Sequence, residues 1–399
     1  MRLGFWARSS AKFVVTGWVT NIPMDEIEDR KKKIILFIDS LVSGGAQRQL
    51  VTLACELSKK KYPVCVLTYR NETQLLWMLN KRGIRYHVVE KKSKLDLRFF
   101  FRLVVFFRHE QPDCIISYLN TPNFWARIAG RIARVPTIIT SERNIDINRS
   151  SVRVNLERIL YRLSTKIVVN ANAIQELLVE VGLPIEKIKV IQNGLDTVYF
   201  QRRSEIRRQE FRRNIGVGDG ETLITLVGRM QQQKNHVGLL RAFASLGHLN
   251  SSIKIMFVGN EIEPAIKQKL KDLCSASDME HQVIFAGAKD NLPLIYTASD
   301  FTILPSLWEG FPNALIESMA CETPVIATDI ADNRLIISDE SMGYIVPREN
   351  ETALANTILS ASRMTIAERQ KMGRESREKI IKMCGLDRFV TRYEELIEA

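Results

Sequence analysis

Cysteine is scarce and scattered in this chain of 399 residues. The six cysteines (Cys55, Cys65, Cys114, Cys274, Cys321 and Cys384) form no CxxC pair, and none has a histidine at ligand spacing. This pattern argues against a zinc module and a disulfide framework, and it is typical of a protein from a reducing compartment. The chain also lacks the roughly 18–20 uninterrupted apolar residues that a spanning helix requires. The stretch 3–20 is broken by Arg8 and Lys12, so we do not expect a secretory signal.

Metal and dinucleotide motifs are absent as well. The five histidines show no HxxxH spacing, and no GxGxxG follows a predicted strand. Hydride chemistry is therefore unsupported, and we expect no metal ion and no cofactor.

Positive charge is concentrated in the first half of the chain. Residues 1–200 carry 32 Lys/Arg against 18 Asp/Glu, whereas residues 201–399 carry 25 against 27. The first half is predicted to face something anionic, either nucleic acid or the cytoplasmic membrane surface. A scattered solvated surface is the alternative.

Short apolar runs alternate with helical patterns along both halves, which predicts α/β architecture with doubly wound parallel sheets. In the first half the pattern gives strands at 34–38, 62–69, 84–89, 113–117 and 136–140, with helices at 50–57, 73–82, 96–109 and 122–133. In the second half it gives strands at 223–228, 254–258, 283–286, 301–304 and 324–327, with helices at 235–246, 263–276, 291–297 and 313–321. The end, 366–398, has a helical pattern with expected breaks at Gly373 and Gly385. We expect an extension at 1–30, domains at 31–200 and 201–375, and a C-terminal helix at 376–399.

One loop of the second half carries an acidic motif. The segment 305–317, PSLWEGFPNALIE, follows a strand and opens a helix, with Pro312 placed where its missing N–H is not needed. Glu309 is expected to project from the loop and Glu317 from the helix. The free N–H groups of Asn313 and Ala314 would favour an anion, and Glu317 would accept hydrogen bonds from ribose hydroxyls. Surface carboxylates are the alternative interpretation.

A second loop of the same half is basic. The segment 227–235, VGRMQQQKN, directly follows the first strand of this half and carries Arg229 and Lys234. Ligands of doubly wound sheets bind beyond the carboxyl ends of the strands, where both loops are expected. Arg229 and Lys234 would neutralise a diphosphate there, although loop cations are often only solvated.

These motifs carry a family resemblance. The segment EGFPNALIE at 309–317, together with Ser43-Gly44-Gly45-Ala46-Gln47-Arg48, Asn193-Gly194-Leu195-Asp196 and Gly228-Arg229 with Lys234-Asn235, resembles the retaining GT-B glycosyltransferases called glycosyl transferases group 1. The resemblance runs from about residue 33 to 397. It implies the GT-B fold, in which two Rossmann-like domains face a cleft.

The resemblance also implies roles for individual residues. It implies a nucleotide-sugar donor held mainly by the C-terminal domain, an acceptor on the N-terminal domain, and transfer in the cleft between them. Glu309 would be the catalytic residue beside the transferred sugar, and Gly44 and Gly45 would let the first loop approach the donor. The expected donor-binding residues are Gly44, Gly45, Arg229, Lys234, Gly310, Phe311, Asn313, Ala314 and Glu317. No covalent nucleophile is then needed, and stabilisation of the leaving diphosphate becomes the main contribution of the protein.

The sequence departs from the family pattern at several positions. Where the family often has a donor-facing histidine, this chain reads TSERN at 140–144, so Arg143 replaces that histidine, recognises an acceptor phosphate, or pairs with Glu142. Gln47 and Leu335 stand where Glu is frequent, and Glu322 stands where Gly is frequent. No DxD occurs, which weakens the alternative glycosyltransferase fold that uses a carboxylate-bound metal ion.

The segment 95–109 is strongly apolar and has a narrow basic edge. It is interpreted either as a helix packed on the sheet, with its arginines in solvent, or as a helix lying at a membrane interface. We favour the packed helix.

Together these features predict a cytoplasmic glycosyltransferase, with peripheral contact to the inner face of an anionic membrane as a further expectation. It would move one sugar, expected to come from a UDP-sugar, to a glycan or lipid-linked glycan in surface polysaccharide or lipopolysaccharide synthesis. A nucleotide-sugar epimerase or a glycan phosphorylase on the same fold is the alternative enzyme. A nucleic-acid-binding protein is a remote alternative, because the charge is spread without aromatic interleaving, so no nucleic-acid partner is expected.

Overall fold

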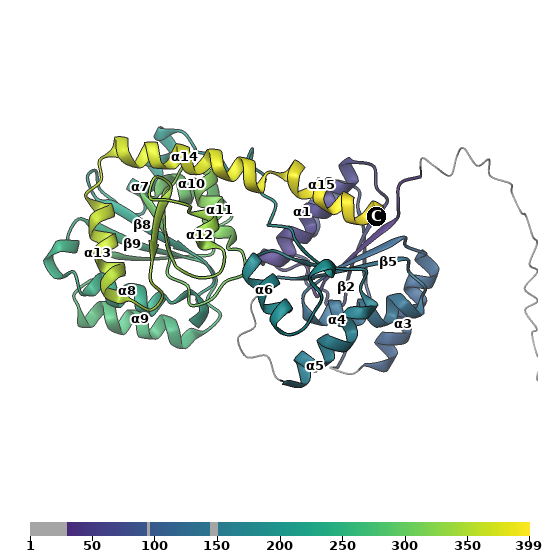
Figure 1. Cartoon of the computed structure of the whole chain (residues 1–399). Coiled ribbons are helices and arrows are strands. Elements are labelled where there is room, and N and C mark those ends of the chain that lie inside the picture. The colour runs from purple at the N-terminus through teal and green to yellow at the C-terminus, as the bar shows by residue number, and fades with distance from the viewer. Residues whose placement is uncertain (1–29, 94–95, 144–150) are drawn as a thin grey trace, which may run out of the picture. The chain divides into compact units, whose positions relative to one another are not determined.

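The structure is a computed structural model, and it describes residues 30–93, 96–143 and 151–399. The extension expected at 1–30 lies outside the described residues except for Arg30. Figure 1 shows strands alternating with helices along the described chain. We call the first sheet with its helices the first lobe, and the second sheet with its helices the second lobe.

The first lobe contains a sheet of seven parallel strands in the order β3-β2-β1-β4-β5-β6-β7. Its strands are β1 (Ile34–Phe37), β2 (Val64–Thr68), β3 (Arg85–Val88), β4 (Cys114–Tyr118), β5 (Thr137–Glu142), β6 (Lys166–Val169) and β7 (Ile188–Val190). Its helices are α1 (Gly45–Lys59), α2 (Leu76–Asn80), α3 (Leu97–Glu110), α4 (Asn120–Ile132), α5 (Ser151–Leu160) and α6 (Asn172–Glu180). Every residue of β1 is fully buried, as expected for an unbroken apolar run in a parallel sheet covered on both faces.

The second lobe repeats this architecture with six parallel strands in the order β10-β9-β8-β11-β12-β13. Its strands are β8 (Thr222–Val227), β9 (Ile253–Val258), β10 (Val283–Gly287), β11 (Phe301–Leu304), β12 (Val325–Thr328) and β13 (Gly343–Val346). Its helices are α7 (Glu205–Asn214), α8 (His236–Ala244), α9 (Pro264–Ala276), α10 (Leu292–Ala298), α11 (Asn313–Ala320), α12 (Asn333–Ile336) and α13 (Glu351–Ser362). The predicted pair of doubly wound parallel sheets is confirmed.

Each sheet has one place where the strand order reverses direction. In the second sheet this place lies between β8 and β11, which are hydrogen-bonded neighbours although three α-helices and two strands separate them along the chain. The loops that follow two such strands leave the sheet on opposite sides and open a crevice at their carboxyl ends. The loop after β8 carries Lys234 and the loop after β11 carries Glu309, so the topology itself brings these residues together.

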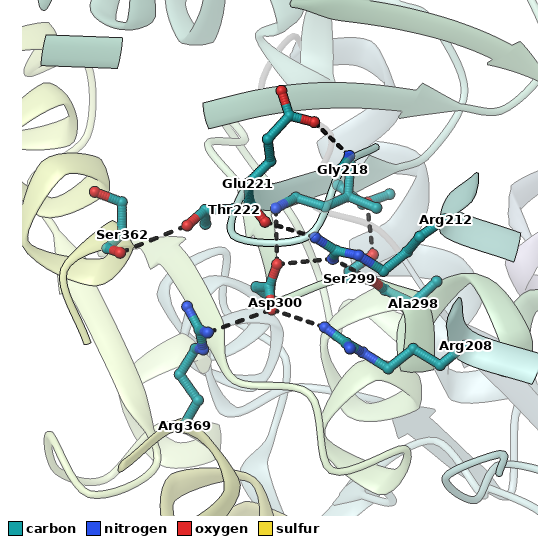
Figure 2. Close-up of polar contacts among 12 residues, drawn as sticks. Arg208, Arg212, Gly218, Glu221, Thr222, Ala298, Ser299, Asp300, Ser362 and Arg369 are labelled. Carbon is teal, nitrogen blue, oxygen red and sulfur yellow. Dashed lines mark hydrogen bonds and ion pairs between the residues drawn. The ribbon is translucent and has the colours of Figure 1, made fainter. Parts of the chain in front are cut away.

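The basic stretch 202–213 forms α7, which is bound to the second sheet by an internal charge cluster (Figure 2). Asp300, at the start of β11, accepts a hydrogen bond from Arg212 Nη1 at 2.9 Å and one from Arg208 Nη2 at 3.1 Å. The same carboxylate also accepts from the backbone N–H of Leu223 at 2.8 Å, and Arg369 lies 3.7 Å away. Much of this positive charge is therefore neutralised inside the lobe rather than offered to an external anion.

Two helices end the chain, α14 (Ile366–Cys384) and α15 (Leu386–Glu398). Helix α14 packs on α11 of the second lobe, whereas α15 places Phe389, Tyr393 and Ile397 in the core around β1 and α1 (Figure 1). The Tyr393 hydroxyl lies 2.8 Å from the hydroxyl of Tyr118 at the end of β4. The last helix thus belongs to the packing of the first lobe.

The break expected at Gly373 is wrong, because α14 runs through it without interruption and ends only at Gly385. Gly373 is a packing position, since a Cβ there would overlap the carbonyl oxygen of Glu322 in the turn after α11. The boundary expected between residues 375 and 376 falls inside this helix.

Candidate functional site

An ion pair between two loops forms the centre of the site. Lys234 Nζ lies 2.5 Å from Glu309 Oε1, and both side chains are mostly buried, with 14% and 8% of their surface exposed. Ser306 Oγ donates to the same carboxylate oxygen at 2.8 Å. The stem of Lys234 crosses Gly228, where an added Cβ would lie 3.2 Å from Lys234 Cε. The two motifs predicted to converge therefore meet, and a glycine leaves room for the lysine.

Gln233, which the sequence analysis did not single out, fixes one loop against the other. Its side-chain amide donates to the backbone carbonyl oxygen of Trp308 at 2.8 Å. Its backbone carbonyl oxygen accepts from the backbone N–H of Leu307 at 2.9 Å. A second amide, Gln231, donates to Gln233 at 2.7 Å. No local pattern marks Gln233 as a bridging residue, because its partners lie about 75 positions along the chain.

Arg229 is not part of this ion pair. Its side chain is exposed, and within the described parts of the chain its guanidinium forms no hydrogen bond and no ion pair. It leaves the loop directly after Gly228, at the carboxyl end of β8. Arg229 is thus a free cation beyond the carboxyl end of β8, in the same loop as a lysine that is already paired.

Glu317 lies on α11, buried against neighbours that the motif did not reveal. The Tyr296 hydroxyl donates to Glu317 Oε2 at 2.8 Å. Burial raises the pKa of Glu317, while the positive charge of Arg48 and the hydrogen bond from Tyr296 act in the opposite direction. Arg48 belongs to the glycine motif of the first lobe, so this motif and Glu317 share one electrostatic environment. Glu317 has no contact with the Lys234 and Glu309 pair, and its expected contact with a ribose stays a prediction.

The N-terminus of α11 meets the first lobe through Asn193. The Asn193 amide donates to Asn313 Oδ1 at 2.6 Å and to the carbonyl oxygen of Phe311 at 3.1 Å. A Cβ at Gly45 would lie 2.9 Å from Asn313 Nδ2, so the glycine motif closely approaches the same helix end. Gly44, at the N-cap of α1, lies instead against Gln47 in the first turn of that helix.

Among the other expected donor-binding residues, Phe311 and Ala314 are placed differently from what side-chain recognition would need. Phe311 is buried in the apolar core of the second lobe, and Ala314 packs against that core. Phe311 thus offers a ligand little side-chain surface, whereas Ala314 is half-buried, and contact of either residue with the donor stays a prediction. Gly310 faces the first lobe, where an added Cβ would lie 2.9 Å from the carbonyl oxygen of Arg143.

Arg143, just after β5, is buried beside this junction. Its Nη2 donates to Asn193 Oδ1 at 2.9 Å, and its guanidinium lies 4.5 Å from the centre of the Tyr118 ring. It forms no ion pair with Glu142, which instead accepts from Asn123 Nδ2 at 3.1 Å. Of the three roles considered for Arg143, pairing with Glu142 is therefore not what the side chain does.

Within 30–93, 96–143 and 151–399, no three histidine, cysteine or acidic side chains gather in a way that suits a metal ion. Over the same ranges, no helix combines the length and apolar character needed to cross a membrane.

Comparison with protein families identifies the class that this fold and site define. Residues 207–379 match the family model of glycosyl transferases group 1, and residues 43–199 match that of glycosyltransferase family 4. The two matches fall on the second and first lobes and leave only short segments uncovered. The chain is therefore a glycosyltransferase with the GT-B fold, in which each lobe matches one of two glycosyltransferase family models.

Individual relatives are more distant. The chain is 28% identical over 352 residues to an N-acetylgalactosamine-N,N'-diacetylbacillosaminyl-diphospho-undecaprenol 4-alpha-N-acetylgalactosaminyltransferase of Campylobacter jejuni, covering 81% of this chain and 88% of the relative. It is 23% identical to a UDP-Gal:alpha-D-GlcNAc-diphosphoundecaprenol alpha-1,3-galactosyltransferase of Escherichia coli, covering 75% and 79%. The solved structure of Anabaena HepE in complex with UDP and glucose has a TM-score of 0.83 at 19% identity, covering 92% of this chain and all of that one.

Proposed function

We propose that this glycosyltransferase transfers a sugar from a UDP-sugar to a lipid-linked glycan, with retention of the anomeric configuration and without a metal ion. The observation that carries the proposal is the Lys234 and Glu309 pair, placed at the strand-order reversal of the second sheet. The printed names of the Campylobacter and Escherichia relatives, both of which describe diphospho-undecaprenol sugars, support a lipid-linked acceptor. The likeness to a UDP-bound structure supports the donor.

In this proposal cations replace a metal ion at the leaving group. Lys234, held by Glu309, and the free Arg229 bind the donor diphosphate, the lysine as a point charge and the arginine through its planar fork. The free N–H groups at the start of α11 add partial positive charge. These groups stabilise the negative charge that develops on the leaving diphosphate, which is the largest contribution available to a site without a nucleophile.

The transfer takes place on one face of the sugar. The bond between the anomeric carbon and the diphosphate oxygen breaks, and the acceptor oxygen forms the new bond from the same side. The acceptor proton passes to the leaving phosphate oxygen. Glu309 stabilises the positive charge on the sugar ring, and Glu317 binds the ribose in exchange for its present hydrogen bond from Tyr296.

The acceptor requires access to a membrane, and α3 offers a surface that suits it. Leu97, Phe101 and Val105 recur every fourth residue and are 68%, 64% and 64% exposed, while Phe99, Leu103 and Phe107 are buried against the sheet. Arg98 and Arg102 flank the exposed row. The helix packs on the sheet, as favoured from the sequence, and it also presents a second apolar row beside cations. We therefore place the enzyme at the cytoplasmic surface of an anionic membrane.

A thermal-shift screen of nucleotide sugars tests the proposed activity first, because a donor that binds only the folded protein raises its melting temperature. UDP and at least one UDP-sugar are expected to stabilise the chain. Incubation of that donor with polyprenyl-diphosphate-linked glycans should then extend the glycan, and nuclear magnetic resonance of the product should show the anomeric configuration of the donor. Isomerised donor in the absence of acceptor, or an inverted product, would contradict the proposal.

A further inference from the structure

Among the described residues, the first lobe contains a buried cation for which no counter-ion is found. Arg143 is 8% exposed, and its neighbours include the neutral amide of Asn193, the ring of Tyr118 and the hydroxyl of Tyr393. Its Nη1 is buried and has no hydrogen-bond partner. Across the described residues, Arg143 forms no ion pair with any carboxylate.

This arrangement is unfavourable for the protein alone. A buried guanidinium loses its hydration, and cation–π contact with one ring and one neutral hydrogen bond replace only part of it. Other buried arginines of this chain are paired, as Arg127 is with Glu157 and Arg212 is with Asp300. Removing one member of such an ion pair is strongly destabilising, because it leaves a buried charge without a partner. Arg143 is a buried charge of this kind in the unliganded protein.

A second unpaired polar group lies near the backbone of Arg143, next to the residue that follows Glu309. Asn170, just after β6, has a buried Oδ1 with no partner. A Cβ at Gly310 would lie 2.9 Å from the carbonyl oxygen of Arg143 and 3.1 Å from Asn170 Oδ1, and Gly310 directly follows Glu309. Arg143 and Asn170 follow neighbouring strands at their carboxyl ends, which is where parallel sheets bind ligands.

We propose that Arg143 binds an anionic oxygen group of a substrate, which supplies the missing counter-ion. The inference rests on the proposed function, because Arg143 is assigned to a substrate on the ground that its backbone lies close to the loop that carries Glu309. The donor diphosphate is assigned to Lys234 and Arg229, so two sources remain, a phosphate of the acceptor or a carboxylate on the transferred sugar. Both present oxygens that a guanidinium binds strongly. Asn170 would turn its amide to complete the site.

Binding measurements on the full chain distinguish these sources. Arg143→Gln removes the charge and keeps a hydrogen-bond donor for Asn193. Arg143→Lys keeps the charge but lacks the planar guanidinium. Arg131→Gln, at an exposed position, is the matched control. Isothermal titration compares UDP, UDP-glucose and UDP-glucuronate, which differs from UDP-glucose by one carboxylate. Geranyl diphosphate is titrated with and without saturating UDP.

The proposal predicts that UDP binds wild type and Arg143→Gln within about twofold, while one anionic probe loses about tenfold or more in affinity. Loss of a preference for UDP-glucuronate over UDP-glucose identifies a sugar carboxylate. Loss of geranyl diphosphate binding identifies an acceptor phosphate. Partial rescue by Arg143→Lys and no change in Arg131→Gln are expected in either case.

Equal affinities of wild type and Arg143→Gln for both anionic probes would overturn the proposal. Failure of UDP to bind any variant would instead refute the proposed function, while geranyl diphosphate without UDP would still report on Arg143. Unliganded Arg143→Gln should melt at or above the wild-type temperature. A fall as large as that of Arg212→Gln, which breaks a buried pair, would show that Arg143 is structural and would also overturn the inference.

Discussion

Lys234 and Glu309 lie 75 positions apart in the chain, and their charged atoms are 2.5 Å apart in the fold. The pair is largely screened from solvent, and Ser306 and Gln233 hold its surroundings. A lysine fixed in this way is oriented before any ligand arrives. Preorganised charge of this kind stabilises a leaving group without reorganisation at the moment of reaction.

Lys234→Ala is expected to reduce turnover by roughly 10²–10³-fold, the cost of removing one preorganised electrostatic group. Because Glu309 would be left unpaired, the melting temperature should fall as well. The double variant Lys234→Ala/Glu309→Gln removes both charges, so it should regain stability without regaining activity. Lys267→Ala, which breaks the partly exposed ion pair of Lys267 with Glu261, serves as the control. Wild-type turnover in Lys234→Ala would remove the lysine from the mechanism.

Glu317→Gln is expected to stabilise the unliganded protein at pH 7. Burial raises the pKa of Glu317 in the folded state, so ionisation costs stability as the pH rises from the unfolded value of about 4.5 through the folded value. A glutamine keeps an acceptor for Tyr296 and has no charge to desolvate. Melting curves should show a gain that is larger at pH 7 than at pH 4, together with weaker UDP binding. Exposed Glu378→Gln should show no such pH dependence, and a gain independent of pH would contradict this explanation.

His236 should give the opposite pH dependence. Its burial against Phe257 lowers its pKa to about 4, with a smaller contribution from the charge of Lys234. The unfolded state therefore binds a proton that the folded state refuses between about pH 6.5 and 4, and stability falls by about 3 kcal/mol as the pH decreases through that window. His236→Phe should flatten the acid limb of the stability curve, whereas exposed His281→Leu should not. An unchanged acid limb would show that His236 is accessible to protons.

Phe101→Ser and Val105→Ser are expected to weaken flotation with liposomes that contain anionic lipid. Each of these two substitutions removes apolar area from the exposed row of α3. Arg102→Gln should weaken membrane binding about fivefold at low salt, because one basic residue near the membrane surface contributes about 1 kcal/mol. Ile206→Ser, on α7 and 77% exposed, is the matched control. Binding that ignores lipid charge and salt would exclude this surface.

The sequence was sufficient to predict the two sheets and the meeting of Lys234 with Glu309. Both follow from apolar runs and from the rule that ligand loops leave a parallel sheet at a strand-order reversal. The sequence analysis missed the short strands β6, β7 and β13, which have four, three and four residues and no long apolar run, so their periodicity was too weak to assign.

Gly373 and Arg143 were beyond local reasoning for a different reason. A glycine inside a helical pattern predicts a helix break. At Gly373 the glycine is present because the backbone of the turn at Glu322 packs on it, and that contact cannot be recognised from the local sequence. The environment of Arg143 depends on Tyr118, Asn193 and Gly310, which lie far away in the chain. Such contacts become visible only when the lobes are folded.

The most direct test of the account is a single-turnover transfer measurement with Glu309→Gln. The variant keeps the size of the side chain and an acceptor for Ser306, but it loses the charge that faces Lys234. From the proposed role of Glu309, we expect transfer of the sugar from UDP-sugar to a lipid-linked glycan to slow by roughly 10²-fold or more. The affinity for UDP should change only a few-fold. Transfer by Glu309→Gln at the wild-type rate would contradict that role.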